Sequence, residues 1–199
     1  KNPILLSTGA ATLGEIEEAL EAIGHKQIIL LHCTLCYPTK DEDANLNLIT
    51  TLKQTFPDYE VGLSDHTLGT FAPSIAVALG AKVIEKHYTV DNTLDKSADH
   101  WLSVNPEQAK EMIEKIKKTS ILLGAKRKKI FDCEKETYKY DKRSIVSKCD
   151  IPKGTKITKE MLTCKRPGTG IPPKFMSILI GRKAKKLIKQ DTTIKWTTI

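Results

Sequence analysis

The sequence predicts an α/β fold in which a parallel sheet is followed by a small, mostly β module. In the first part of the chain, four short apolar runs alternate with segments of helical periodicity, which is typical of βα units. From residue 142 onward, the apolar stretches are short and are broken by turn signals such as "RPGTG". The two parts also differ in charge, because residues 142–199 hold 15 of the 32 basic residues and 3 of the 24 acidic residues.

This change in charge predicts the domain boundaries. Residues 142–199 carry a net charge of +12, whereas residues 1–141 carry a net charge of −4. We predict a first domain over residues 1–124 and a second domain over residues 142–199. The segment between them, residues 125–141, is rich in charged side chains and is predicted to be a linker.

Four apolar runs are the predicted strands of the first domain. Each is short, rich in aliphatic residues and followed by a polar or turn-forming segment. They span residues 3–9, 28–34, 61–67 and 82–89. Strands of this kind that alternate with helices form a parallel sheet whose two faces are both covered.

Capping residues mark the predicted helices between these strands. The first helix begins after Thr12, because Glu15 three residues on completes a capping box, and it ends at Gly24. Two further helical patterns cover residues 46–56 and 71–81.

The last predicted helix of the first domain is the longest. Asn105 is its N-cap, Pro106 occupies its first position and Gly124 ends it. Four βα units in a row fit either a doubly wound sheet or part of a (β/α)8 barrel. The sequence has no G-x-G-x-x-G motif and no P-loop, which disfavours the nucleotide-binding version of the doubly wound fold.

The composition is that of a globular protein with a core, since 40% of the residues are hydrophobic and 28% are charged. No apolar run approaches the roughly 18 residues that a membrane-spanning helix needs. The five cysteines are irregularly spaced, which predicts free thiols in a reducing compartment and hence a cytoplasmic location. The sequence has no initiator Met and opens almost at once on a strand, so we expect a segment of a longer protein.

Histidines stand where three of the predicted strands meet their loops: His32, His66 and His87. The carboxyl ends of parallel strands lie at one edge of the sheet, where α/β proteins build their active sites. A single histidine there is more often a packed structural residue, but three in consecutive units favour a site, and imidazole is a common metal ligand. The further candidates near them in the pattern are Ser7, Tyr37, Ser64, Asp65 and Glu85.

Cys33 and Cys36 have the C-x-x-C spacing of redox and zinc motifs. A redox pair is followed directly by a helix whose N-terminus lowers the thiol pKa, but here Tyr37 and Pro38 continue the loop. A zinc ribbon needs a second pair, and the other three cysteines are unpaired in sequence. We therefore interpret Cys33 and Cys36 as packing residues.

Five motifs in this order resemble the sialic acid synthases, the family of the N-acetylneuraminate, legionaminate and pseudaminate synthases. They are "ILLSTG", "LLHCT-x-x-YPT", "GLSDHT", "IEKHYT" and "KRPGTG", and the resemblance covers nearly the whole chain. It implies the last four βα units of a (β/α)8 barrel followed by a small antifreeze-like (SAF) domain. It also implies condensation of phosphoenolpyruvate with an N-acetylmannosamine-type sugar, which releases phosphate and yields a nine-carbon 2-keto acid.

The resemblance also implies roles for individual residues. His66 and His87 resemble the ligands of a divalent metal ion, manganese or magnesium, that polarises the sugar aldehyde. Glu85 and Asp99 match acids that bind the sugar, so Glu85, His66 and His87 are the candidate catalytic residues. The residues implied to bind phosphoenolpyruvate are Ser7, Tyr37 and Ser64. His32 is not an implied ligand and is expected to form a wall of the pocket.

A contribution from a second subunit is implied for the C-terminal motif. Arg166 resembles an arginine that one subunit of a homodimer inserts into the site of the other, towards the N-acetyl group of the sugar. The homodimer would therefore be domain-swapped. We expect Arg166 to lie away from His66 and His87 of its own chain.

Two departures from the family pattern bear on activity. Leu35 stands where the family often has Asn or Ser, so one polar contact to phosphoenolpyruvate is expected to be missing. The family's first four βα units, which would carry a general acid/base Glu and Lys residues that neutralise phosphate, are absent from this sequence. A half-barrel would expose two edge strands, and we expect the chain to be inactive alone.

A binding module without catalysis is the alternative hypothesis. The basic segments 126–129 and 181–186 could attract nucleic acid or another polyanion. Aromatic residues for base stacking are sparse in the basic domain, which has Phe175 and Trp196. We therefore favour a solvated basic face that attracts anionic substrates, with neither a membrane nor a nucleic acid as partner.

Overall fold

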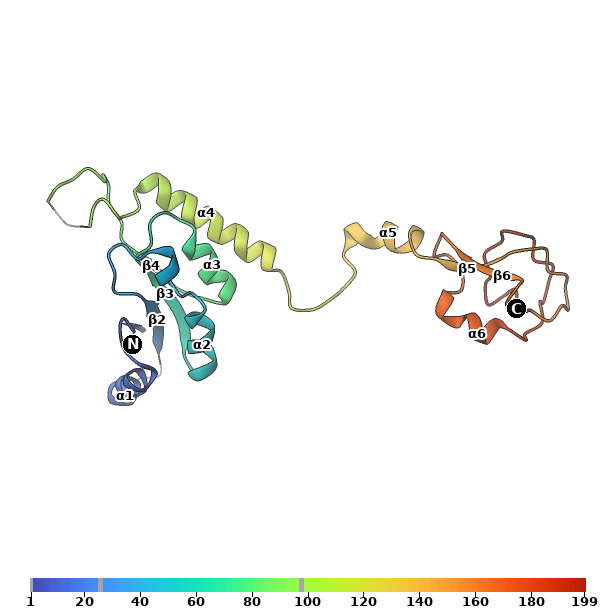
Figure 1. Ribbon diagram of the computed structural model, residues 1–199, viewed down its shortest axis with the longest axis horizontal. Helices are drawn as coiled ribbons and strands as arrows, with labels where there is room; N and C mark the ends of the chain where they lie inside the picture. The colour runs from blue at the N-terminus through green and yellow to red at the C-terminus, as the bar shows by residue number, and fades with distance from the viewer. Residues whose placement is uncertain (1, 25–26, 97–98) are drawn as a thin grey trace. The chain divides into compact units, whose positions relative to one another are not determined.

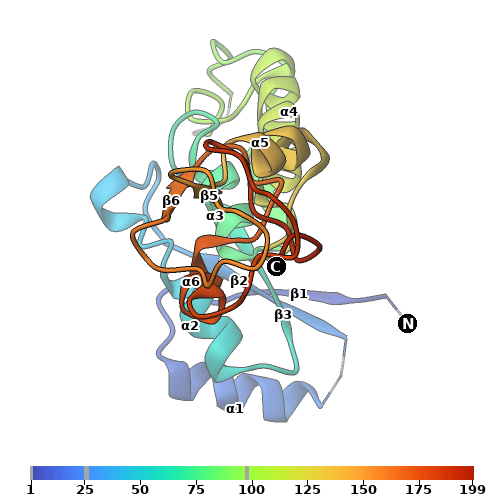
Figure 2. The ribbon, with the colours of Figure 1, turned by 90° about the vertical axis from the view of Figure 1, so that its right-hand side faces the viewer.

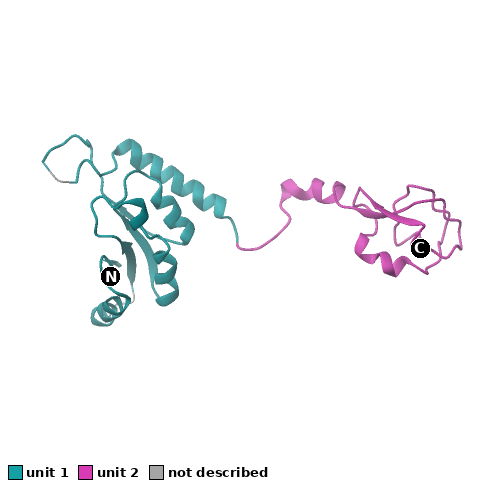
Figure 3. Ribbon diagram, viewed as in Figure 1, with its two compact units in different colours: residues 1–125 teal, residues 126–199 magenta. Residues whose placement is uncertain are grey.

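The computed structural model describes residues 2–24, 27–96 and 99–199, and the chain divides into two compact units (Figure 3). Unit 1 is residues 1–125 and unit 2 is residues 126–199. Each unit has a hydrophobic core of its own. No helix in the described part of the chain is long and apolar enough to cross a membrane.

Unit 1 is built on a four-stranded parallel sheet (Figures 1 and 2). Its strands, side by side in chain order, are β1 (Ile4–Ser7), β2 (Ile28–Cys33), β3 (Glu60–Asp65) and β4 (Ile84–Lys86). A doubly wound sheet reverses its strand order part-way across, and this sheet does not. Right-handed crossovers that always step in one direction keep the helices on one face, as in a (β/α)8 barrel. The strand order therefore favours the barrel-type alternative.

Three helices cover one face of this sheet: α1 (Leu13–Ile23), α2 (Leu48–Thr55) and α3 (Ala72–Leu79). Their apolar side chains and alternate strand residues share one core. Its buried members are Ile16, Leu20, Ile28, Leu30, Ile49, Leu52, Phe56, Val61, Leu63, Ala76 and Ala81. Burial of each of the larger side chains stabilises the fold by about 1.5–3 kcal/mol. The fourth helix, α4 (Pro106–Leu123), packs against α3.

Local capping chemistry confirms two of the predicted helix starts. The Thr12 hydroxyl accepts a hydrogen bond from the backbone N–H of Glu15, whose carboxylate accepts one from the N–H of Thr12. Gly24 then ends α1 with a φ of +58°, a conformation that glycine adopts without strain. At the start of α4 the same reciprocal pair forms between Asn105 and Gln108. Each such N-cap stabilises its helix by about 1 kcal/mol.

The fourth strand is shorter than the sequence predicted. β4 ends at Lys86, and the chain beyond it pairs with the segment that leads into α4. The N–H of Thr89 donates to the Val104 carbonyl, and the N–H of Val104 donates to the His87 carbonyl. His87 is therefore the first residue beyond the strand, at the carboxyl edge of the sheet.

The face of the sheet opposite α1–α3 is called the inner face below. Leu31 on β2 is fully buried there beside Gly62 on β3. A Cβ atom on Gly62 would lie 2.5 Å from the Val83 carbonyl oxygen and 2.6 Å from Cδ2 of Leu31, so only glycine allows this packing. At the edge of the sheet, β1 is largely exposed, and the Leu5 side chain remains 47% accessible.

Unit 2 consists of short elements around a compact aliphatic core. Its strands β5 (Ser144–Ser147) and β6 (Leu162–Lys165) are antiparallel, and short helical turns form η3 (Pro173–Phe175) and α6 (Met176–Leu179). Isolated bridges such as Ile151 to Ile188 extend the pairing. The buried core residues are Ile145, Ile151, Ile157, Leu162, Ile171, Leu179, Ala184, Ile188, Ile194 and Ile199.

The segment predicted to be a linker has structure of its own. It contains η2 (Asp132–Glu134) and α5 (Lys135–Tyr140). Its end is tied to unit 2, because the Lys139 carbonyl accepts from the N–H of Gly168 and the Asp141 carbonyl accepts from Nε of Arg166. Most of this segment therefore belongs to unit 2.

Candidate functional site

The carboxyl edge of the unit 1 sheet brings several predicted site residues together on the inner face. Side chains alternate between the two faces of a strand, so the register decides which ones meet. Cys33, Ser64 and Glu85 are neighbours across β2, β3 and β4. The hydroxyl of Ser64 donates to Oε1 of Glu85 at 2.7 Å. This bond holds the Glu85 carboxylate beside the strand ends.

Three rings cluster beyond this row of residues. His66 follows β3 directly and His87 follows β4 directly, and their ring centroids are 5.3 Å apart. The Tyr37 ring lies 4.2 Å from that of His66 and 5.8 Å from that of His87. Tyr37 comes from the loop between β2 and the 3₁₀ helix η1 (Asp41–Asp43). Three segments far apart in sequence therefore build one group of polar rings.

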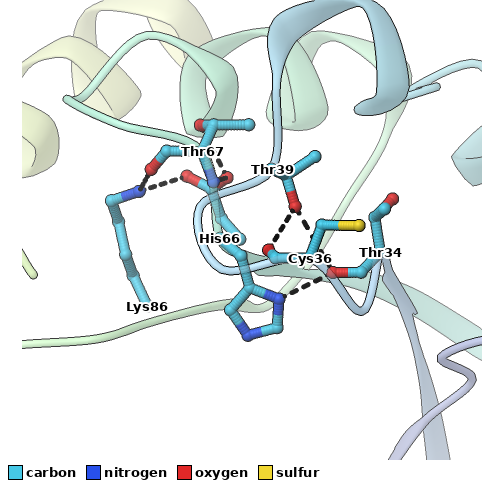
Figure 4. A network of polar contacts seen from close by, with 7 residues as sticks. Thr34, Cys36, Thr39, His66, Thr67 and Lys86 are labelled. Atoms are coloured by element: carbon cyan, nitrogen blue, oxygen red, sulfur yellow. Dashed lines mark hydrogen bonds and ion pairs between the residues drawn. The ribbon is translucent and has the colours of Figure 1, made fainter. Parts of the chain in front are cut away.

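The environment of His66 determines which of its ring nitrogens carries the proton. Nδ1 lies 2.9 Å from the backbone carbonyl oxygen of Thr34, which can only accept a hydrogen bond (Figure 4). Nδ1 therefore holds the proton in the neutral ring, and Nε2 keeps a lone pair. Figure 4 shows Nε2 pointing away from this contact. An imidazole fixed in this way is suited to bind a cation through Nε2.

An acidic residue approaches the second histidine. Oδ2 of Asp99 lies 3.8 Å from Nδ1 of His87. The side chains of His87 and Asp99 are 31% and 45% exposed, so this contact lies at the open side of the cluster. The more exposed ring of the pair is thus accompanied by a carboxylate.

Burial and charge keep two further groups protonated. Burial raises the pKa of the Cys33 thiol, and the Glu85 carboxylate nearby adds to the rise, while hydrogen bonds with Ser64 and Gly9 oppose it. Partial burial and the neighbouring Cys33, Asp99 and Glu85 raise the pKa of the Tyr37 phenol. At neutral pH, Tyr37 is therefore a hydrogen-bond donor and Cys33 is not a thiolate nucleophile.

Among the predicted site residues, Ser7, Asp65 and Arg166 lie outside this cluster, and Asp65 lies on the helix-covered face with its register partner Lys86. Ser7 ends β1 and pairs in register with Leu31, so it reaches the same edge of the sheet but lies on its exposed outer strand. Arg166 lies in unit 2, where its Nε donates to the Asp141 carbonyl at 2.8 Å and its guanidinium is 3.8 Å from the Asp141 carboxylate. Its side chain is 66% exposed and belongs to the surface of that unit.

The "HCTLC" stretch differs from the prediction at Cys36, and strand register sets the position of His32. His32 shares the helix-covered face with Leu30, and its ring Nε2 donates to the Ala44 carbonyl at 2.7 Å. It lines a small cavity of about 10 Å³ together with the predicted site residues Ser64 and His66. Of the two cysteines taken as packing residues, Cys33 is buried but Cys36 is exposed in the loop, so that interpretation is wrong for Cys36.

The residues present could hold a cation with two protein ligands. His66 and His87 are close together, and one nitrogen of His66 is free to bind, as shown above. Within the described residues, no three His, Cys, Asp or Glu side chains converge as a full metal-binding group. Water and substrate would have to complete the coordination shell, which is the usual arrangement of a catalytic metal.

Family models match both units of this chain. The model described as "NeuB family" matches residues 1–128, and the model described as "SAF domain" matches residues 142–199. The chain belongs to the NeuB family. This confirms the resemblance to the sialic acid synthases and the small SAF domain, and named relatives include legionaminic, pseudaminic and N-acetylneuraminate-9-phosphate synthases.

Individual relatives show how much of a NeuB-family protein this chain spans. It is 45% identical to an uncharacterized protein of Methanocaldococcus jannaschii, over 98% of this chain and 58% of that protein. It is 38% identical to the N,N'-diacetyllegionaminic acid synthase of Legionella pneumophila, over 100% of this chain and 57% of that enzyme. The solved N-acetylneuraminic acid synthetase of Leptospira borgpetersenii serovar Hardjo-bovis, in complex with citrate, is 38% identical with a TM-score of 0.63, covering 68% of this chain and 47% of that one. The chain therefore spans less than two thirds of the length of these relatives.

Proposed function

We propose that this chain forms the C-terminal part of a nonulosonic acid synthase. The enzyme condenses phosphoenolpyruvate with an N-acetylmannosamine-type sugar, releases phosphate and produces a nine-carbon 2-keto sugar acid. The observation that carries the proposal is the cluster of His66, His87 and Tyr37 beside the Ser64–Glu85 pair, at the carboxyl edge of a NeuB-family sheet. Active sites of parallel α/β folds are built at this edge.

His66 and His87 are the proposed ligands of a divalent cation, Mn²⁺ or Mg²⁺. A centroid separation of 5.3 Å is compatible with two imidazoles that share one ion at about 2.0–2.1 Å per bond. When bound, the cation supplies Lewis-acid polarisation of the sugar carbonyl, which makes its carbon a better target for C3 of phosphoenolpyruvate.

The remaining polar residues have proposed roles in holding the two substrates. The hydroxyls of Ser7 and Tyr37 donate to the phosphate and carboxylate of phosphoenolpyruvate, and the raised pKa keeps the Tyr37 phenol protonated for this at neutral pH. Ser64 joins them when its hydroxyl turns away from Glu85, to which it donates in this structure. The carboxylates of Glu85 and Asp99 accept from sugar hydroxyls and orient the aldehyde end.

Leu35 weakens this substrate-binding arrangement at one point. Its side chain is 56% exposed and lies against Gly9, close to the site loop. An aliphatic side chain there has no hydrogen bond to offer phosphoenolpyruvate. We infer weaker phosphoenolpyruvate binding than in relatives with Asn or Ser at this position.

The complete enzyme requires more than this chain. The relatives are longer, and in this structure β1 and β4 are the edges of the sheet while inner-face residues such as Leu5 stay exposed. We propose that four preceding βα units complete the barrel and supply the cationic groups for the phosphate. Arg166 would enter the site from the SAF domain of the partner subunit in a domain-swapped homodimer.

Reconstitution of activity tests the proposed function. The chain alone and the chain joined to the first four βα units of a relative are incubated with phosphoenolpyruvate, N-acetylmannosamine and Mn²⁺, and released phosphate is measured. We expect sugar-dependent phosphate release from the joined protein only, and its loss in His87→Ala. Equal release with and without the sugar, or full activity of His87→Ala, would contradict the proposal.

The basic charge of unit 2 supports one alternative function. Its net charge of +12 could serve an anion- or nucleic-acid-binding module without catalysis. Titration of generic duplex DNA at increasing salt separates the two functions. Binding that persists at physiological salt would favour the module, and binding lost below it would favour the synthase.

A further inference from the structure

A charged residue stands directly before each of the two histidines, and both of these residues are buried. The side chains of Asp65 and Lys86 are 1% and 3% exposed, and Nζ of Lys86 lies 2.6 Å from Oδ2 of Asp65. Thr67 closes the network, as Figure 4 shows. Its N–H and hydroxyl donate to Oδ1 of Asp65 at 2.9 and 2.8 Å, and its carbonyl accepts from Nζ of Lys86 at 2.7 Å.

This ion pair joins the two strand ends that carry the histidines. Asp65 and Lys86 are register partners in the parallel pair β3–β4, on the helix-covered face. The residue that follows each strand, His66 or His87, points to the opposite side, where the rings meet. The extended backbone continues past Asp65, because the N–H of Thr39 donates to the His66 carbonyl. A link between residues 65 and 86 therefore joins the two chain segments one residue before each histidine.

Stability alone does not account for a buried ion pair at this place. The desolvation of two charges often cancels their attraction, so that well-packed apolar residues of similar size serve a fold equally well. The neighbouring register pair on the same face, Leu63 and Ile84, is apolar. A short charge-assisted hydrogen bond between the last residues of two strands fixes the relative position of the strand ends, whereas apolar contact allows that position to vary.

We propose that Asp65 and Lys86 are positioning residues that set the separation and orientation of the His66 and His87 rings. The inference about the rings stands on the contacts above, and its consequence for a bound cation rests on the proposed function. Since both residues face away from the cluster, they act through the backbone and touch no substrate.

The test removes both charges and keeps the shape. In Asp65→Asn/Lys86→Met, the amide oxygen still accepts from Thr67 and a side chain of similar length replaces the lysine. In Asp65→Asn alone, the ammonium loses its counter-charge in a buried site, which destabilises strongly. The matched control is Glu111→Gln/Lys115→Met, which removes an exposed ion pair of the same unit whose charged atoms are 2.8 Å apart. Leu52→Ala, a core variant on helix α2, serves as a control for lowered stability.

Two readouts are taken on the full chain: Mn²⁺ affinity by electron paramagnetic resonance, and nuclear Overhauser effects between the ring protons of His66 and His87. We expect the double variant to recover much of the urea midpoint lost in Asp65→Asn, yet to bind Mn²⁺ at least tenfold more weakly and to lose the ring-to-ring effect. The control pair and Leu52→Ala should keep both the Mn²⁺ affinity and the ring-to-ring effect. Wild-type affinity and an intact ring contact in the double variant would overturn the proposal.

The two readouts also separate this proposal from the proposed function. If the wild-type chain binds no Mn²⁺, the cation role of the histidines fails. The positioning role is then decided by the ring-to-ring effect, which needs no metal. Loss of that effect in the double variant supports the positioning role, and its persistence contradicts it.

Discussion

The two units of this chain differ in how completely each one buries its own strands. All four residues of β5 in unit 2 are buried, and Ile145 at its centre is fully inaccessible. In unit 1, none of the four residues of β1 is buried, and Leu5 and Ile4 remain 47% and 37% exposed. Unit 2 thus closes its core within a short segment, whereas unit 1 leaves its edge strand β1 exposed, although Leu31 and Cys33 on the inner face of β2 are buried.

This difference bears on function, because the candidate site lies on the unfinished side. His66, His87, Ser64 and Glu85 are held by the strand ends of unit 1, on the face that the helices leave open. In the proposed enzyme, such a site depends on the segment that covers that face. Arg166, in contrast, is presented by a unit that needs no completion.

The largest expected effect is the loss of a core side chain in unit 2. Ile145→Ala should cost about 2–5 kcal/mol of unfolding free energy, because a fully buried side chain leaves a cavity. Leu5→Ala in β1 should cost under about 1 kcal/mol, since half of that side chain is already in water. The chain has two tryptophans, so Trp101→Phe leaves Trp196 as a fluorescence reporter of unit 2 in urea, and Trp196→Phe leaves Trp101 for unit 1. Equal losses of unfolding free energy in the two variants would contradict the difference in burial between the two units.

A smaller effect is expected at Gly62, where the inner face of unit 1 is tightly packed. Gly62→Ala should destabilise unit 1 by about 1–3 kcal/mol, because the new Cβ would overlap the Val83 carbonyl and Leu31. Gly14→Ala, within α1 and with no atom inside 4 Å of its Cβ position, should stabilise by about 0.5–1 kcal/mol. Urea denaturation followed by Trp101 fluorescence compares the two. If Gly62→Ala were neutral, the inner face would be looser than described.

The smallest effect concerns acid sensitivity at the surface of unit 2. The backbone N–H of Gln190 and the ammonium of Lys189 donate to Asp150 and lower its pKa. A lowered pKa means that the folded state favours the carboxylate, so its contribution is present above the unfolded value of about 3.9 and is lost as the pH falls below it. Asp150→Asn should therefore reduce the pH dependence of the stability of unit 2 between about pH 5 and pH 3. Thermal melts across this range measure it. An unchanged slope would show that these hydrogen bonds do not persist in solution.

Features set by neighbouring residues were predictable from the sequence. The reciprocal bonds of Thr12 with Glu15, and of Asn105 with Gln108, need only four consecutive residues, and the structure contains both. The convergence of His66 and His87 was also predictable, because parallel strands end at a common edge.

Features that depend on strand register were not predictable. Like His66 and His87, His32 lies at the end of an apolar run in the sequence. However, β2 continues to Cys33, so the alternation of side chains turns His32 to the helix-covered face. Cys33, not His32, is aligned with Ser64 and Glu85. The Asp65–Lys86 pair escaped sequence analysis for the same reason, because its members become neighbours only through the β3–β4 register.

Hydrogen–deuterium exchange at the strands most directly tests the central proposal, that a further segment completes the half-barrel of unit 1 while unit 2 buries its core by itself. The chain is measured alone and joined to the first four βα units of a relative. We expect the amides of β5 and β6 to be protected in both proteins, and those of the edge strands β1 and β4 to gain protection only when joined. Full protection of β1 and β4 in the chain alone, or no gain on joining, would contradict this account of the fold and its site.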